Sequence, residues 1–286
     1  MQTIAYLGPE KTNTHFAARK KFGPKAKYLH VPTVEDVFEK ILGEEVSFGV
    51  VPVENSLEGT VAHTLDQFSE FPEVRIYGEI EIPIEHCLVT RRGTRIDNVR
   101  AIFSHPQALA QCREWLRKNI PKANLFEASS TAQALSELVP SLRPRAFRKF
   151  RVLDPKVCAA IGRREIAHEY RLEATRIPIR RENRTRFLIV SRKSPRRGKR
   201  GKTSIMFALK DRPGALHDVL VPFKKTGINL TKIESRPSKR RAWEYVFFVD
   251  CEGYESDPKV RKAIEALRRR TSECRVLGSY PLEVQR

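Results

Sequence analysis

The sequence predicts two α/β domains in series, a larger one extending to about Val190 and a smaller βαββαβ domain beginning at Thr203. Three observations support this prediction. Short β-like runs alternate with amphipathic helical stretches in the first part, a basic segment poor in apolar residues follows, and the order of elements then changes. The 286 residues, of which 40% are apolar, are enough to fill one large core and one small core.

Four runs in the first part are typical of strands. Amphipathic stretches separate them, which favours an α/β sheet with helices on both faces. The four runs are Thr3–Leu7, Phe48–Val53, Arg100–Ser104 and Arg186–Val190.

Two helices of the first part are marked by their ends. Thr33 offers an N-cap hydroxyl to a segment that Gly43 closes, and acidic residues occupy its first turn. Pro106 begins the second helix, along which apolar residues recur at helical spacing. We expect both helices to be mainly scaffold.

The elements after the basic segment follow the order βαββαβ. This order builds a ferredoxin-like sandwich of one antiparallel sheet and two helices. The expected elements are strand Thr203–Leu209, helix Ala215–Lys225, strand Asn229–Ser235, strand Trp243–Asp250, helix Pro258–Arg270 and strand Arg275–Tyr280.

Much of the formal net charge of +20 is concentrated in two stretches. Ser191–Lys202 carries seven positive charges and no acidic residue, and Arg143–Arg151 carries five more. Proline, glycine and self-repelling charge are typical of a linker. We therefore predict a linker at 191–202 between a domain at 1–190 and a domain at 203–286.

The N-terminus enters an apolar strand-like run without a basic leader, a long apolar segment or a cleavage site. We therefore expect a soluble cytoplasmic protein with no membrane partner. The cysteines include no pair at metal-ligand or redox spacing, so buried thiols are expected. They are Cys87, Cys112, Cys158, Cys251 and Cys274.

Four blocks of sequence carry a resemblance to a known family. They are VVPVENSLEGT (Val50–Thr60), GEIEIPIEHCLV (Gly78–Val89), SHPQALAQC (Ser104–Cys112) and NRTRF (Asn183–Phe187). In this order they resemble the prephenate dehydratase family, and GAL at 214–216 with ESRP at 234–237 resembles its ACT domain. The resemblance implies two α/β lobes with the active site in the cleft between them, as in type II periplasmic binding proteins.

The resemblance implies that the chain converts prephenate to phenylpyruvate in phenylalanine biosynthesis. Aromatisation of the ring drives this reaction, so no metal, cofactor or covalent nucleophile is required. The sequence contains no paired His/Cys/Asp ligand motif and no phosphate-cradling glycine loop. Because the dehydratase strand starts by Thr3, we expect no chorismate mutase segment before it, and hence a monofunctional enzyme.

Matching the family motifs position by position assigns Thr185 to catalysis, as a hydrogen-bond donor or relay beside the leaving hydroxyl. Arg186 is interpreted either as a clamp for a substrate carboxylate or as a structural salt bridge, because strand alternation turns it away from Thr185. The other expected substrate-binding residues are Asn55, Ser56, Ser104, Gln111 and Thr12.

Some of these positions also have a structural interpretation. On local sequence alone, Asn55 and Ser56 are better explained by a turn at the end of a strand. Glu54 is a candidate for a salt bridge between the lobes, and Phe187 is expected in the core. His105 precedes a proline and is held extended, so we leave it out of the catalytic residues.

The loop Gly8–Thr14 departs from the family pattern. It reads GPEKTNT where the family usually has a sequence close to GPxGTFS, so Lys11 replaces a glycine. We expect an altered loop conformation, with Lys11 as an alternative partner for a substrate carboxylate. The basic stretch at 178–183 and an apparent insertion at 143–151 are further departures.

The C-terminal domain is expected to sense phenylalanine. The first turn of the helix beginning near Ala215 exposes amides that suit an amino-acid carboxylate, and Glu234 suits its ammonium group. The resemblance implies feedback inhibition at a subunit interface of a homodimer or homotetramer. The alternative is that GAL only starts a helix and ESRP only ends a strand. The expected effector-binding residues are Gly214, Ala215, Leu216, Glu234 and Ser235.

Two other functions remain open. An arogenate dehydratase acts on the amino counterpart of the same ring and would share every motif. A non-catalytic amino-acid sensor, or a protein that contacts nucleic acid through its basic stretches, is the second alternative. Nucleic acid is disfavoured, because only Phe147 and Phe150 in those stretches are available for base stacking.

Overall fold

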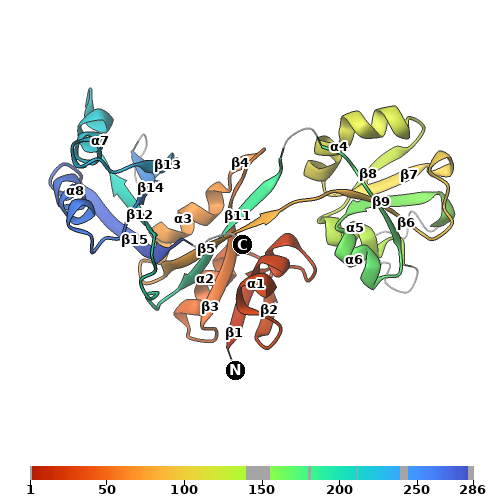
Figure 1. Cartoon of the computed structure of the whole chain (residues 1–286), viewed down its shortest axis with the longest axis horizontal. Helices are drawn as coiled ribbons and strands as arrows, with labels where there is room; N and C mark the ends of the chain where they lie inside the picture. Colours follow the sequence, from red (N-terminus) through yellow and green to blue (C-terminus); the bar gives the residue numbers. More distant parts are fainter. Residues whose placement is uncertain (1, 140–154, 180–181, 211, 239–243, 283–286) are drawn as a thin grey trace. The chain divides into compact units, whose positions relative to one another are not determined.

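The computed structural model describes residues 2–139, 155–179, 182–210, 212–238 and 244–282 (Figure 1). The chain forms two compact units. Unit 1 comprises Met1–Leu7, Ala17–Ile82 and Thr185–Arg286, and unit 2 comprises Gly8–Phe16 and Pro83–Arg184. The insertion expected at 143–151, residues 180–181 of the basic stretch and the expected strand start at Trp243 lie outside the described residues.

Unit 1 contains a six-stranded sheet in which β11, the strand that carries most of the NRTRF block, lies between β3 and β5. The order is β2-β1-β3-β11-β5, and β4 pairs with β3. β1 is parallel to β2 and β3, whereas β11 is antiparallel to β3. The strands are β1 (Thr3–Leu7), β2 (Lys27–Val31), β3 (Phe48–Asn55), β4 (Gly59–Thr60), β5 (Arg75–Pro83) and β11 (Arg184–Ser191).

Helix α2 shows why the local sequence folds as predicted. Thr33 accepts a hydrogen bond from the Asp36 amide while the Asp36 carboxylate accepts from the Thr33 amide, which forms a capping box. The buried face of α2 then packs against β1 and β3. The helices around this sheet are α1 (Asn13–Phe22), α2 (Val34–Leu42) and α3 (Ala62–Glu70).

Unit 2 contains a five-stranded sheet with a core on each face. Phe103 belongs to one core and its neighbour Ile102 to the other, which confirms a sheet covered on both sides. The strand order is β10-β6-β9-β7-β8. The elements are η1 (Ile96–Asn98), β6 (Cys87–Thr90), β7 (Ala101–Ser104), α4 (Pro106–Asn119), β8 (Asn124–Glu127), α5 (Thr131–Ser136), η4 (Pro155–Val157), β9 (Cys158–Gly162), α6 (Arg164–Glu169) and β10 (Glu173–Arg176).

The C-terminal domain, residues 201–282, has the predicted βαββαβ order. Its strands form an antiparallel sheet in the order β13-β14-β12-β15. Helices α7 and α8 cover the face that points away from α3 (Figure 1). The elements are β12 (Gly201–Ala208), α7 (Ala215–Thr226), β13 (Leu230–Pro237), β14 (Tyr245–Glu252), α8 (Pro258–Arg268) and β15 (Glu273–Pro281).

The other face of the C-terminal sheet shares a core with the six-stranded sheet of unit 1. Met206 and Phe248 belong to the same buried cluster as Val53 and Leu188. At Gly278 a Cβ atom would lie 2.2 Å from the Ile76 carbonyl oxygen, so β15 approaches β5 at a distance that only glycine permits. The two sheets are therefore held by direct packing.

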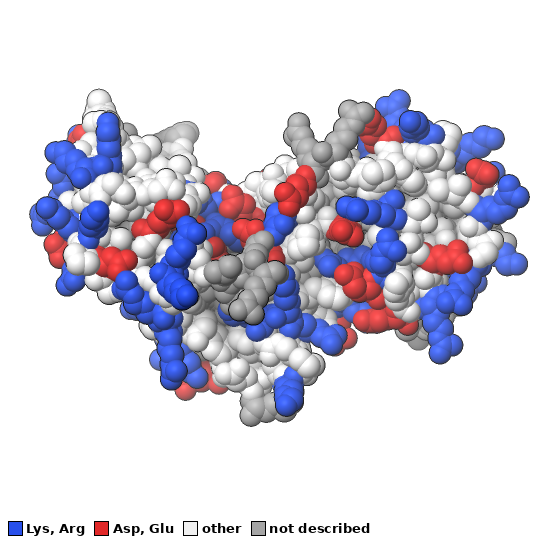
Figure 2. Space-filling view, viewed as in Figure 1, with Lys and Arg blue, Asp and Glu red and all other residues white. Residues whose placement is uncertain are grey.

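The connection between the domains is shorter than the predicted linker. Ser191 still belongs to β11 and donates a hydrogen bond to the Ser47 carbonyl, while Gly201 and Lys202 already belong to β12. Lys202 is buried, and Glu79, 2.6 Å from its ammonium group, compensates its charge. Figure 2 shows Lys and Arg side chains scattered over the visible face of the C-terminal domain and of unit 2, with Asp and Glu among them.

The cysteines pack as expected. Four of the five are buried, Cys274 is half-buried, and no disulfide joins them. Burial raises the pKa of Cys112 to about 12, which suits a structural thiol. None of the described helices is long and apolar enough to cross a membrane.

Lys11 adopts a left-handed conformation, with φ of 64°, at the position where the family pattern has glycine. Its ammonium group lies 2.7 Å from Glu169 and 4.1 Å from the centre of the Tyr170 ring. Arg163 donates a hydrogen bond to Asn13 in the same loop. The loop is therefore held to α6 by contacts that compensate for the unfavourable backbone.

Comparing Lys11→Gly with Lys11→Ala separates these two effects. Both variants lose the ion pair, but only glycine relieves the left-handed backbone, so we expect Lys11→Gly to be more stable by about 1 kcal/mol. Urea unfolding of both purified variants measures the difference. Equal stability would mean that position 11 changes its backbone conformation when the lysine is removed.

Candidate active site

Asn55 and Thr185 meet at the end of β3. They are register partners in the antiparallel pairing of β3 with β11, and Asn55 Nδ2 donates a 2.9 Å hydrogen bond to Thr185 Oγ1. Because the hydroxyl accepts this bond, its own hydrogen is left to donate to another group. The two residues that the family motifs assign to the site therefore lie together, and their contact with a substrate stays a prediction.

The turn expected at Asn55 is also present. Its Oδ1 accepts hydrogen bonds from the amides of Leu57 and Glu58, at 3.0 and 3.2 Å. The turn fixes the carbonyl end of the side chain, and this orientation directs the amide nitrogen to Thr185. The structural interpretation of Asn55 is therefore confirmed, and its contact with a substrate stays a prediction. Ser56 follows with an exposed side chain.

Gln111, on α4, has its carbonyl oxygen held by two donors within unit 2. Asn183 Nδ2 donates to it at 2.8 Å, and His86 Nε2 lies at 2.7 Å from it. Both neighbours are buried. With the oxygen held in this way, the side-chain amide of Gln111 is fixed in one orientation.

Ser104 and Thr12 have hydroxyls engaged within the fold. Ser104 is fully buried at the end of β7 and donates a 2.9 Å hydrogen bond to the Ile161 carbonyl of β9. Thr12 donates to the Pro9 carbonyl at 3.0 Å and accepts from the His15 amide at the start of α1. Contact of either residue with a substrate stays a prediction.

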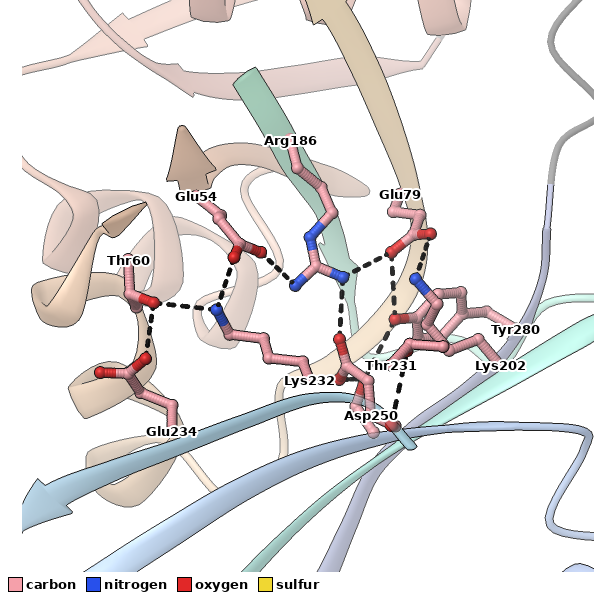
Figure 3. A network of polar contacts seen from close by, with 11 residues as sticks. Glu54, Thr60, Glu79, Arg186, Lys202, Thr231, Lys232, Glu234, Asp250 and Tyr280 are labelled. Atoms are coloured by element: carbon pink, nitrogen blue, oxygen red, sulfur yellow. Dashed lines mark hydrogen bonds and ion pairs between the residues drawn. The ribbon is translucent and has the colours of Figure 1, made fainter. Parts of the chain in front are cut away.

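Arg186 lies on the opposite side of β11 from Thr185, as strand alternation predicts. Its guanidinium contacts three carboxylates, at 3.1 Å from Glu54, 3.1 Å from Glu79 and 2.8 Å from Asp250 (Figure 3). Burial alone would lower the pKa of Arg186, but Asp250 and the other anions outweigh this and raise it. Of the two interpretations of Arg186, the structure contains the salt bridge.

Glu54 differs from its expected place. It was expected to join the two lobes, but its carboxylate lies beside Arg186 and 3.2 Å from Lys232 of β13, and all three residues belong to unit 1. Phe187, at 1% exposure, is in the core as expected. His105 is extended and caps α4 by accepting a hydrogen bond from the Gln107 amide.

The expected effector-binding residues divide between the two faces of the C-terminal sheet. Gly214, with φ of 75°, precedes α7 on the helix-covered face, and the register of β13 places Ser235 on that face through Phe247. Glu234 pairs with Phe248, which faces the core of unit 1. Its carboxylate accepts a 2.7 Å hydrogen bond from Thr60. Within one chain, Glu234 therefore has a partner other than an effector.

Sequence reasoning did not find several residues that hold the predicted site residues of each unit in place. His86 and Asn183 orient Gln111, and Glu79 and Asp250 hold Arg186. His86 and Asn183 stand within the family blocks, but no local spacing shows that they meet Gln111. Among the described residues, no group of three His, Cys, Asp or Glu side chains is arranged to hold a metal ion.

Comparisons with known proteins agree with the resemblance in the sequence. The family model for prephenate dehydratase matches residues 4–195, and that for the ACT domain matches residues 203–269. A bifunctional chorismate mutase/prephenate dehydratase of Aquifex aeolicus is 44% identical over 97% of this chain and 73% of its own length. A prephenate dehydratase of Methanocaldococcus jannaschii is 36% identical over 98% of each chain.

One solved structure extends the agreement to three dimensions. The prephenate dehydratase of Arthrobacter aurescens in complex with L-Phe is similar with a TM-score of 0.84. It is 33% identical in sequence, and the match covers 97% of this chain and 89% of that one. The match therefore includes the C-terminal domain as well as the six-stranded sheet of unit 1 and the five-stranded sheet of unit 2.

Burial of His86 has a consequence for stability. Burial lowers the pKa of His86, and the Gln111 hydrogen bond offsets this only in part. The unfolded chain takes up the proton near pH 6.5 and the folded chain at lower pH, so stability falls below about pH 6.5, by at most about 1.4 kcal/mol per pH unit. His86→Gln keeps a nitrogen donor and removes the titration.

We expect the wild type to lose more stability than His86→Gln between about pH 7 and 5.5. Urea unfolding of both proteins at the two pH values measures the difference and cancels the titration of groups that they share. The same loss in both proteins would contradict a buried neutral His86.

Proposed function

This chain belongs to the prephenate dehydratase family and carries an ACT domain, and we propose that it converts prephenate to phenylpyruvate, carbon dioxide and water. The match over almost the full lengths of the chain and of a prephenate dehydratase carries this proposal. The hydroxyl of Thr185, supported by Asn55, is the local geometry that suits it.

The reaction needs a proton or a hydrogen bond at the departing ring hydroxyl. Loss of the carboxylate as carbon dioxide leaves an electron pair that completes the aromatic ring as the hydroxyl departs. We assign Thr185 to that hydroxyl as donor, because Asn55 already occupies an acceptor site on its oxygen. A positioned donor lowers the barrier because it stabilises charge that develops on the leaving oxygen.

Polar residues of unit 2 suit the carboxylates of prephenate. Gln111 supports this role, since His86 and Asn183 hold its carbonyl oxygen and fix the orientation of its side-chain amide. We also propose, from the family motifs, that Ser56, Ser104 and Thr12 contact the substrate. Arg186 is assigned a different part below, because three carboxylates surround it.

L-Phenylalanine is the proposed effector. The related protein of Arthrobacter aurescens was solved with L-Phe, and the amides at the start of α7 suit an amino-acid carboxylate.

The C-terminal domain also presents an edge that suits pairing with a second copy. β13 is an edge strand of the sheet, and exposed apolar residues lie on it and on its neighbours, namely Ile233 on β13, Leu216 on α7 and Tyr245 on β14. An open edge with apolar neighbours favours pairing with a second copy, so we propose a homodimer or homotetramer.

We propose a cytoplasmic location for the enzyme. No disulfide joins its five cysteines, as is usual where thiols are kept reduced.

The hydroxyl of Thr185 is tested by two substitutions, one that keeps the shape of the side chain and one that keeps the hydroxyl. Thr185→Val keeps the branched shape and removes the hydroxyl, so we expect kcat to fall about 100- to 1000-fold, the usual loss for one transition-state donor. Thr185→Ser keeps the hydroxyl and should retain far more activity. Phenylpyruvate formation from prephenate by the purified proteins is the measurement.

Wild-type turnover in Thr185→Val, with a loss only in Thr185→Ser, would show that the shape of the side chain matters and the hydroxyl does not. Arogenate is offered to the wild type in a parallel assay. A wild type that converts arogenate to phenylalanine and leaves prephenate unchanged would overturn the substrate proposed here.

The effector site is tested by the two glycines that flank α7. Gly214 and Gly227 both have positive φ, with values of 75° and 68°, and neither has an atom within 4 Å of an added Cβ. Alanine at either position therefore strains the same helix to a similar extent. We expect Gly214→Ala to weaken inhibition by phenylalanine about ten-fold, and Gly227→Ala to leave it nearly unchanged.

Calorimetric titration with L-phenylalanine and inhibition of prephenate turnover measure these effects. Equal weakening in both variants would mean that strain in α7, and not contact with its first turn, explains the loss.

A further inference from the structure

Six charged side chains meet between the C-terminal sheet and the six-stranded sheet of unit 1. Three are basic and three are acidic, so the cluster is balanced in charge, and all but Glu54 have side chains that are at most 11% exposed. Figure 3 shows the Arg186 guanidinium between the carboxylates. The members are Arg186, Lys202, Lys232, Glu54, Glu79 and Asp250. We call this set the ion cluster.

The ion cluster lies directly behind the proposed catalytic pair. Thr185 pairs with Asn55 in the strand register, and the next pair along is Arg186 with Glu54. Side chains alternate along a strand, so one pair lies on each side of the two-stranded ribbon. The salt bridge of 3.1 Å between Arg186 and Glu54 therefore ties the same two strands at the place where the hydrogen bond between Thr185 and Asn55 forms on the other side.

The register next to this point is irregular. A shift in pairing occurs between Arg186 and Phe187, so the backbone ladder does not by itself continue the alignment of β11 with β3. The side-chain contact between Arg186 and Glu54 provides a second constraint at this bulge. Loss of this constraint would let the strand end that carries Thr185 move relative to Asn55.

The position of Arg186 depends in turn on the C-terminal sheet. Asp250 of β14 contacts Arg186 at 2.8 Å with one carboxylate oxygen, and its other oxygen accepts a 2.6 Å hydrogen bond from Ser204 of β12. The close approach of Gly278 to Ile76 fixes the separation of the two sheets beside this contact. Asp250 is thus a rigid anchor that only the C-terminal domain supplies.

We propose that Arg186 is a positioning residue of the dehydratase. Its guanidinium, anchored by Asp250, holds Glu54 and thereby the alignment of Thr185 with Asn55 on the catalytic side of the ribbon. The inference rests on the proposed function, because the role of Thr185 does. It also assigns the C-terminal domain a part in catalysis that does not require a bound effector.

Asp250→Asn tests this proposal without changing either strand of the ribbon. It removes the charge that anchors Arg186, and we expect kcat to fall about 10- to 100-fold, as for displaced catalytic groups, while KM changes little. Arg236→Gln is the matched control. Arg236 of β13 contacts Asp66 of α3 at 3.3 Å across the same face of the C-terminal sheet, and we expect its loss to leave kcat nearly unchanged.

A double-mutant cycle separates positioning from general loss of structure. In a Thr185→Ala background there is no hydroxyl to position, so Asp250→Asn should have little further effect on the residual rate. If the two losses multiply, or if Arg236→Gln lowers kcat as much as Asp250→Asn, the proposal is wrong. Ser204→Ala, which loosens Asp250 without removing a charge, replaces Asp250→Asn if that variant does not fold.

Hydrogen exchange provides a readout that does not depend on the reaction. We expect faster exchange in peptides that cover 54–56 and 184–187 in Asp250→Asn, and wild-type exchange there in Arg236→Gln. Unchanged exchange in Asp250→Asn would overturn the positioning role even in an active enzyme. A wild type without prephenate turnover would overturn the proposed function, and the exchange comparison would still decide whether Asp250 aligns the two strands.

Discussion

The pairing of β3 with β11 is the constraint on which the rest of the structure depends. It joins Asn55 to Thr185 across 130 residues of sequence, and all of the second segment of unit 2 lies between them in the chain. Because side chains alternate along a strand, the same pairing places a hydroxyl and an amide on one side and an ion pair on the other. A shift of one residue would exchange the two sides, so the polar partners on each side also specify the register.

The ion cluster is a costly way to fill the space between two sheets. Removing charges from water carries a large penalty, and well-packed apolar side chains in the same place are often as stable or more so. Apolar groups slide past one another more readily than a guanidinium between three carboxylates, whose directions are fixed. The cluster therefore suits the need for one defined alignment of β11 better than a need for stability.

The same principle operates at Gln111 in unit 2, on a smaller scale. An amide side chain can be rotated to exchange its donor and acceptor ends, and two donors at its oxygen remove that choice. The supporting residues are buried and keep water from competing for the amide. Each unit thus contains a proposed site residue with a neighbour that orients it, Asn55 for Thr185 in unit 1, and His86 and Asn183 for Gln111 in unit 2.

The sequence by itself determined the elements, the two-domain order and the residues that carry the family motifs, because caps, periodicity and motif blocks are local. It also predicted that Thr185 and Arg186 face opposite ways, since alternation along a strand is local as well. Only the tertiary structure decided that Arg186 meets Asp250, that Glu54 stays within unit 1, and that Glu234 turns towards Thr60. Those partners depend on sheet order and register across long stretches of chain, which no local pattern encodes.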